Sequence, residues 1–310
     1  MTSSYRTVLV DCLGLSAGEE VLVVTDPERR AIAERLVEAA RRLEAEAVLA
    51  EMSERSSNAA EPPKTIASAM VQADVVVAPT TKSLSHSAAR KAASDAGARV
   101  ATMPGVTEDM LERTMSADYA AVATRSRAVA EKLSAANSVR VTSDAGTDVT
   151  FDLSGRTAIA DTGDLTKPGS FGNLPAGEGF IAPVEGATTG RIVFDGAAAR
   201  YGEPLVIVID DGYAVSFEGE AAQRFRAEIE PRGREAFAVA ELGVGTNEAA
   251  QLTGDVLEDE KVMGTIHVAL GDNHTFGGKV RVASHIDQVV LRPTVTLDGV
   301  ALLTGGELLL

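Results

Sequence analysis

The first 136 residues alternate short apolar runs with segments of helical periodicity. Residues 21–25 are a β-branched run, and the Asp26-Pro27 pair that follows supplies a helix cap and a first-turn proline. Apolar residues then recur at helical spacing between Ile32 and Leu43. Apolar strands that alternate with helices predict a parallel sheet covered on both faces. The predicted strands are 21–25, 47–50, 73–78 and 99–103, and further helices are predicted over 85–96, 107–115 and 119–136.

Beyond residue 136 the pattern changes to short segments separated by glycine turns. Residues 138–143 and 147–152 alternate apolar and polar positions around a turn at 144–146, which predicts a hairpin. We therefore expect an α/β domain over 1–136, followed by a mostly antiparallel, β-rich domain over 137–310 of α+β type. Further strands are predicted over 189–195, 205–210, 214–218, 265–269 and 289–297, with one helix over 221–229.

Composition excludes several classes of partner. The net charge of −16, from 45 acidic and 29 basic residues, repels phosphate backbones and anionic lipid, so we expect neither a nucleic-acid nor a membrane partner. No apolar run approaches the ~18 residues of a membrane span, and no signal peptide is recognised. The single cysteine, Cys12, excludes a cysteine zinc cluster, and a cytoplasmic location is expected.

The parallel half lacks the loop that binds a nucleotide phosphate. Neither G-x-G-x-x-G nor G-x-x-x-x-G-K-[ST] follows residues 21–25, and Asp26-Pro27 stands where the glycines are required. We therefore interpret this half as a scaffold and look for chemistry in the second half.

Candidate metal ligands gather in the second half. His285 and Asp287 alternate with Ile286, so on a strand they share one face at about 7 Å and can chelate a divalent metal. His267 lies in another predicted strand, and Glu178 and Glu241 lie in glycine-bounded segments. Two imidazoles and three carboxylates suffice for two metals that share a carboxylate and a water. Spacing alone also allows a packed, hydrogen-bonded role for these side chains.

Four blocks of this half, in order, resemble the metal-binding blocks of the aminopeptidase T/aminopeptidase S metallopeptidases (peptidase family M29). They are residues 173–178, 241–247, 257–271 and 284–287. The resemblance implies a homodimer and two divalent ions, zinc, cobalt or manganese, held by two Glu, two His, an Asp and a Tyr. His274 stands where the family has tyrosine, and because imidazole also ligates metals it is kept as a ligand. The implied ligands are Glu178, Glu241, His267, His274, His285 and Asp287.

A related group, the iron dioxygenases that open dihydroxypyridine rings, is implied to hold one Fe(II) with two His and one Asp. That resemblance implies histidine at the position of Glu241 and no acid at Glu178. Because both glutamates are present, the predicted function is an aminopeptidase that acts on short peptides with a free N-terminus. Glu178 or Glu241 would be the general base for a metal-activated water. The alternatives are a mononuclear iron dioxygenase acting on a hydroxylated pyridine, and a non-catalytic, metal-stabilised binding protein.

Overall fold

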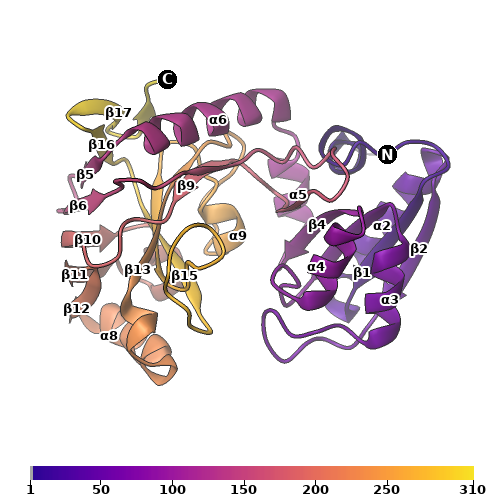
Figure 1. Cartoon of the computed structure of the whole chain (residues 1–310), viewed down its shortest axis with the longest axis horizontal. Helices are drawn as coiled ribbons and strands as arrows, with labels where there is room; N and C mark the ends of the chain where they lie inside the picture. The colour runs from indigo at the N-terminus through magenta and orange to yellow at the C-terminus, as the bar shows by residue number, and fades with distance from the viewer. Residues whose placement is uncertain (1–2) are drawn as a thin grey trace. The chain divides into compact units, whose positions relative to one another are not determined.

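The computed structural model describes residues 3–310, which form two compact units (Figure 1). Unit 1 comprises the chain up to residue 121 together with residues 163–176, and unit 2 comprises residues 122–162 and 177–310. The sequence pattern predicts one boundary near residue 136, whereas these units divide within helix α6 (Tyr119–Ala135) and again on either side of 163–176. Val129 and Leu133 of α6 are buried in the unit 2 core, which accounts for the position of the first division.

Unit 1 is built on one parallel sheet, as the apolar strands predict. Its strand order is β2-β1-β3-β4-β8, and every residue of β3 is buried. The sequence pattern missed β8, a three-residue strand without an apolar run. The strands are β1 (Glu20–Thr25), β2 (Glu46–Glu51), β3 (Val75–Thr80), β4 (Arg99–Pro104) and β8 (Phe171–Asn173); the helices are α1 (Ser3–Arg6), a π-helix (Thr7–Cys12), α2 (Arg30–Arg42), α3 (Lys64–Gln72), α4 (Ala88–Asp95) and α5 (Glu108–Thr114), with a 3₁₀ turn at Pro27–Arg29.

The start of α4 differs from the prediction of a helix over 85–96. The helix begins at Ala88 because the Ser87 side chain accepts a hydrogen bond from the Arg90 amide at 3.1 Å. A serine that caps in this way satisfies an amide that the first helical turn leaves unpaired.

Unit 2 contains two antiparallel sheets, and the predicted fold class is confirmed. Sheet B has the order β12-β11-β10-β6-β5-β16-β17-β18, and sheet C has the order β15-β14-β13-β9-β7. The strands are β5 (Ser138–Thr142), β6 (Asp148–Asp152), β7 (Ile159–Asp161), β9 (Glu178–Ile181), β10 (Thr189–Phe194), β11 (Leu205–Asp210), β12 (Tyr213–Glu218), β13 (Val239–Gly245), β14 (Ile266–Gly271), β15 (His285–Val290), β16 (Thr294–Leu297), β17 (Val300–Thr304) and β18 (Glu307–Leu308); the helices besides α6 are α7 (Ala198–Tyr201), α8 (Glu220–Ile229) and α9 (Val256–Asp259), with 3₁₀ turns at Glu230–Arg232 and Arg234–Phe237.

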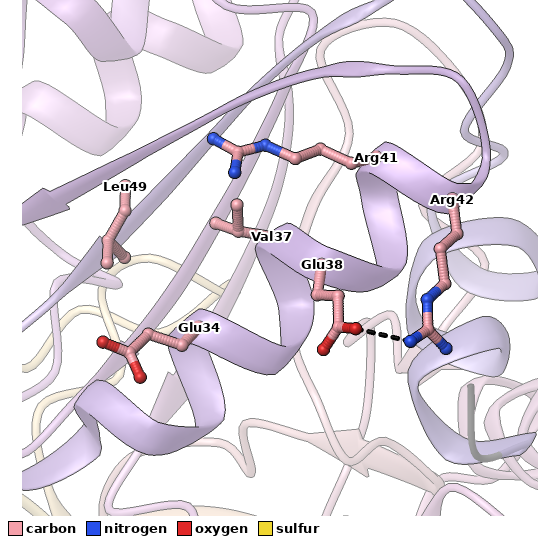
Figure 2. A pocket seen from close by; sticks show the side chains of 6 residues that line it. All are labelled: Glu34, Val37, Glu38, Arg41, Arg42 and Leu49. Carbon is pink, nitrogen blue, oxygen red and sulfur yellow. Dashed lines mark hydrogen bonds and ion pairs between the residues drawn. The ribbon is translucent and has the colours of Figure 1, made fainter.

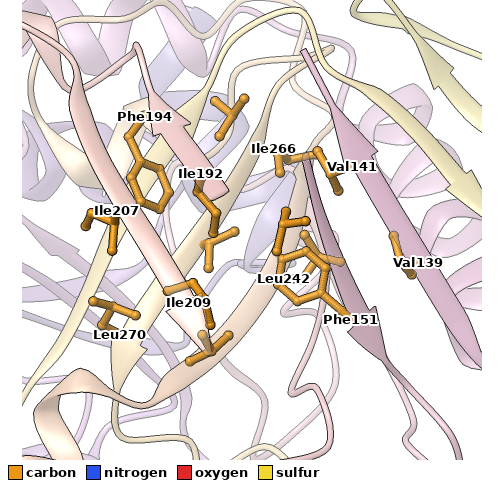
Figure 3. Close-up of a cluster of buried hydrophobic side chains, with 14 of the residues drawn as sticks. Val139, Val141, Phe151, Ile192, Phe194, Ile207, Ile209, Leu242, Ile266 and Leu270 are labelled. Atoms are coloured by element: carbon orange, nitrogen blue, oxygen red, sulfur yellow. The ribbon is translucent and has the colours of Figure 1, made fainter. Parts of the chain in front are cut away.

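The core of unit 2 lies between sheets B and C (Figure 3). Phe151 and Ile192 contribute from sheet B, and Leu242, Ile266 and Leu270 contribute from sheet C. Because side chains alternate along a strand, burying Leu242 and its neighbours on one face of sheet C leaves residues such as Glu241 for the other face.

The single strand predicted over 289–297 is wrong. The structure has β15 ending at Val290 and β16 starting at Thr294, and the two strands belong to different sheets. Pro293 has no amide hydrogen for a ladder, and Arg292 adopts a left-handed φ of 44°, so the chain turns here from sheet C to sheet B. None of the helices within residues 3–310 combines the length and apolar character needed to cross a membrane.

Candidate metal centre

Strand register places acidic and histidine side chains together on one face of sheet C. Glu241 of β13 and Asp287 of β15 both pair with Ala269 of the central strand β14. Residues directly opposite one another in antiparallel strands project to the same face. Glu241 and Asp287 therefore share a face, with only the small side chain of Ala269 between them.

The same register brings in three more of the predicted residues. His267 precedes Ala269 by two positions, and His285 precedes Asp287 by two, so each stays on this face. Glu178, the first residue of β9, pairs with Gly245, which lies four residues after Glu241 and also faces this way. Five of the six predicted ligands are therefore collected by one sheet surface.

The five side chains form two groups that share Glu241. In the first group, His267 Nε2 lies 3.0 Å from Glu178 Oε2 and 3.2 Å from Glu241 Oε1. In the second, His285 Nε2 lies 3.5 Å from Glu241 Oε2 and 3.4 Å from Asp287 Oδ2. When several ligand atoms each lie about 2.0–2.2 Å from one metal ion, the distances between those atoms are similar to the separations within each group. Either group could hold a metal ion.

Burial and an unsatisfied carboxylate oxygen show that a cation fits these residues. Glu178, Glu241, His267 and Asp287 are all buried. Asp287 Oδ1 is buried and has no hydrogen-bond partner within residues 3–310. Leaving a carboxylate oxygen in this state is costly, and a divalent ion would satisfy it. Carboxylate and imidazole donors suit zinc, manganese, cobalt or ferrous iron.

The ring of His285 is oriented for ligation through Nε2. Its Nδ1 donates to the carbonyl oxygen of Asp272 at 2.7 Å, which directs Nε2 toward Asp287 and Glu241. Burial lowers the pKa of His285, but the carboxylates of Asp287 and Glu241 outweigh burial and raise that pKa to about 10. Burial raises the pKa of Asp287, and His285 outweighs it, giving about 2. A metal ion that binds here would compete with the imidazolium proton.

A buried lysine, which sequence reasoning missed, contacts the first group. Lys261 Nζ lies 2.5 Å from Glu178 Oε1, 2.7 Å from Glu260 Oε1 and 3.3 Å from Asp161 Oδ2, and its side chain is 2% exposed. Burial lowers the pKa of Lys261, but these carboxylates raise it well above its usual range. Burial likewise raises the pKa of Glu178, and Lys261 with His267 holds that pKa below its usual value. Lys261 is therefore a fixed positive charge.

No sequence signal marks Lys261 or Asp161 for this role. The run from Glu258 to Lys261 is entirely charged, as solvated segments are, and only its contacts show that it is buried. Asp161 is recognised from register, because it pairs with Glu178 across β7 and β9.

His274, the sixth predicted ligand, belongs to neither group found within residues 3–310. Its Nδ1 lies 2.8 and 2.9 Å from the two carboxylate oxygens of Asp272. The residue lies beyond the end of β14 at Gly271, so the register that places His267 does not extend to it. Ligation by His274 stays a prediction.

Two phenylalanines line the exposed side of the second group. The ring of Phe276 meets that of His285 edge to face, with centroids 5.7 Å apart, and meets Phe180 at 5.6 Å. Phe180 pairs with Gly243 and so lies on the same face of sheet C as the ligands. We call Phe180 and Phe276 the aromatic wall.

A surface pocket in unit 1, on α2 and the neighbouring β2, offers no comparable chemistry (Figure 2). Its charged side chains are already paired: Glu38 with Arg42, and Glu34 with Arg30 at 2.8 Å. Arg41 donates to the carbonyl of Ala47 at 2.9 Å. This pocket is a solvated helix surface.

Comparisons with known proteins agree with an enzyme. A family model described as 2,5-dihydroxypyridine 5,6-dioxygenase (NicX) matches residues 1–310. The solved structure of 2,5-dihydroxypyridine dioxygenase from Pseudomonas putida KT2440 is 21% identical, with a TM-score of 0.85, covering 99% of this chain and 96% of that one. Wild-type AmpT from Thermus thermophilus is 18% identical, with a TM-score of 0.71 and 99% of both chains covered. No curated protein sequence matches significantly.

Proposed function

The chain belongs to the 2,5-dihydroxypyridine 5,6-dioxygenase family, and from this premise we propose that it is a metal-dependent dioxygenase that opens hydroxylated pyridine rings. One ferrous ion would be held by Glu241, His285 and Asp287. Family membership favours this alternative over the aminopeptidase predicted first from the sequence, which is not confirmed. The relationships to both enzyme groups that the sequence blocks indicate are confirmed.

One observation about the site supports this proposal most strongly: the second group combines three ligands with access and an aromatic wall. The His285 side chain is 31% exposed, whereas that of His267 is fully buried. Three protein ligands leave coordination positions open for substrate and O₂. The Phe276 ring beside His285 offers an apolar, aromatic surface suited to a planar ring, which prefers stacked or edge-to-face contact.

The ligand set departs from the two histidines and one aspartate implied for these dioxygenases. Glu241 stands at the position implied to be histidine, so the group has one imidazole and two carboxylates. The extra carboxylate adds negative charge, which strengthens the attraction for a divalent cation and disfavours binding of an anionic substrate close by. We therefore expect a hydroxypyridine without a carboxylate substituent to be the preferred substrate.

The bound ion would supply O₂ activation, and the protein would supply position and exclusion of water. In the overall reaction both atoms of O₂ add to the two ring carbons whose mutual bond breaks, so no further oxidant or reductant is consumed. Phe276 and Phe180 would hold the ring against the open side of the ligand group. Asp272, through its carbonyl, would keep His285 in the orientation that ligation needs.

The test is oxygen consumption by protein loaded anaerobically with Fe(II). With 2,5-dihydroxypyridine as the probe, we expect about one O₂ consumed per ring opened, together with loss of the ring's ultraviolet absorbance. His285→Ala, at the exposed ligand, is the matched inactive control. Folded, iron-loaded protein that consumes no O₂ with hydroxylated pyridines would overturn the proposal.

A two-metal aminopeptidase is the second candidate, because Glu241 offers one oxygen to each group, as a bridging carboxylate does. It would take short peptides with a free N-terminus and two ions of zinc, cobalt or manganese, with Glu178 or Glu241 as general base. Cleavage of amino-acid p-nitroanilides by metal-loaded protein would support it. Bound metal that stabilises the fold, with both assays negative, would indicate the non-catalytic binding protein.

A further inference from the structure

The geometry points to Lys261 as a built-in cation that takes the place of a second metal ion, so that the chain holds one ion, at Glu241, His285 and Asp287. The inference rests on the proposed function only for the position of that ion. It concerns how many ions the site admits, which the shared Glu241 alone leaves undecided.

Lys261 contacts Glu178, a residue of the first ligand group. Lys261 Nζ is bound at 2.5 Å to one oxygen of this carboxylate, whose other oxygen is a donor of the first ligand group. A divalent ion on that second oxygen would therefore face the ammonium across a single carboxylate. Two positive charges so close, in a buried site of low effective dielectric, repel one another strongly.

Backbone contacts hold Lys261 in place. The carbonyl of Lys261 accepts a hydrogen bond from the Asn247 amide at 2.9 Å. A Cβ on Gly245 would lie 2.1 Å from the carbonyl oxygen of Val262, so glycine is what lets residues 261 and 262 approach β13. The ammonium therefore reaches Glu178 from an anchored segment.

The acidic side chains of α9 fix the same segment from its other end. Glu258 accepts from the Gln251 amide at 2.8 Å, and Asp259 accepts from the Thr253 amide at 2.7 Å. These carboxylates bind backbone amides of the loop that precedes α9, so they anchor the short helix directly before Lys261. The segment that carries Lys261 is therefore held in place on both sides by hydrogen bonds.

The second group differs from the first in its ion-pair partners. Within residues 3–310, neither Glu241 nor Asp287 forms an ion pair with a lysine or arginine; their partners are histidines, which a metal can use as ligands. Lys261 therefore pairs directly with the first group, whereas the second group has only histidine partners and remains open to an ion.

The experiment counts Co(II) bound by metal-free protein, using elemental analysis after gel filtration and the visible absorption of the bound ion. We expect about one equivalent in the wild-type chain and about two in Lys261→Met, because the first group then lacks its cation. Lys261→Arg, which keeps the charge, should remain at one. Lys91→Met, at an exposed lysine paired with Asp95 in unit 1, is the matched control and should also remain at one.

Removing Lys261 leaves buried carboxylates without their counter-charge, so folding is checked by circular dichroism. Lys261→Gln, which keeps a donor for Glu178, is the second neutral variant, and it too should gain an equivalent. In Lys261→Met/Glu178→Gln the count should return to one, because the first group has lost a ligand. Two equivalents in the wild type, or one in a folded neutral variant, would overturn the inference.

The count also separates this inference from the proposed function. One Co(II) in the wild type and two in Lys261→Met, with no oxygen consumption by the iron-loaded wild type, would uphold the inference and refute the dioxygenase. Two Co(II) in the wild type, with oxygen consumption, would refute the inference alone.

Discussion

Gly243 of β13 lies directly opposite His267 of β14, and a Cβ on Gly243 would fall 2.0 Å from the Nε2 atom of the imidazole. Because residue 243 has no side chain, the His267 ring has room to lie beside Glu241 and Glu178. We predict that Gly243→Ala displaces this ring and lowers the free energy of unfolding by about 1–3 kcal/mol, the usual cost of overpacking. Chemical denaturation measures the change.

The control for this prediction is a double-mutant cycle with His267→Ala. With the ring removed, the added methyl group has space, so Gly243→Ala should cost little in that background. Equal costs with and without the His267 ring would show that the glycine serves the backbone of β13 instead.

The shared position of Glu241 leads to a ranking of metal affinities. Glu241→Gln should lower the affinity for Co(II) by about 100-fold or more, because a carboxylate of the open ligand group is lost. His274→Ala should change the affinity by less than about tenfold, because this residue is bound to Asp272 outside both groups. Isothermal titration calorimetry measures both. A large loss in His274→Ala would instead restore His274 as a ligand.

Strand alternation and family resemblance predict the candidate ligands from the sequence, but each does so for only some of them. His285 and Asp287 share a face because they alternate on one strand, and that is local information. Bringing Glu241 beside them depends on both residues pairing with Ala269, a register between distant strands that no local pattern contains. His274 was included by resemblance alone, and it lies beyond the strand that carries His267.

The fold shows the same limit. The apolar run over 21–25 predicts β1 to within one residue, and the run over 73–78 predicts β3 two residues too early. The three residues of β8, one of them glycine, carry no periodic signal. The buried position of Lys261 could not be predicted either, since a lysine among acidic residues usually faces water. Its burial follows from contacts with Glu178 and Asp161, which come from other strands.

The loop that carries His274 and Phe276 is held to unit 2 by Glu185. The Glu185 carboxylate accepts a hydrogen bond from the Lys279 amide at 2.7 Å and forms an ion pair with Arg156. Burial raises the pKa of Glu185, but these amide and guanidinium contacts outweigh it and hold the pKa below its usual value. A depressed pKa in the folded state means that the contact stabilises the loop above the unfolded pKa and is lost as pH falls through the folded value.

We therefore predict that the Lys279 amide becomes less protected from hydrogen exchange as the pH falls from neutral to below about 4, after correction for intrinsic rates. Glu185→Gln is the matched variant, because it keeps the shape and removes the titrating charge. Its protection should be low throughout this range and nearly independent of pH. Wild-type protection that stays constant with pH would contradict this role of Glu185.

The aromatic wall gives the most direct test of substrate binding. Phe276 contacts His285 edge to face and lies on the loop that Glu185 holds through the Lys279 amide, so we expect its ring to contact a planar ligand bound beside His285. Phe276→Ala should raise the KM for 2,5-dihydroxypyridine by about tenfold, since an aromatic pair contributes about 0.5–1.5 kcal/mol beyond its buried area. The kcat should change less, because Glu241, His285 and Asp287 are untouched.

Phe237→Ala, which breaks the pair with Phe217 instead, is the control: it should lower stability and leave KM unchanged. An unchanged KM in Phe276→Ala would place the substrate ring elsewhere.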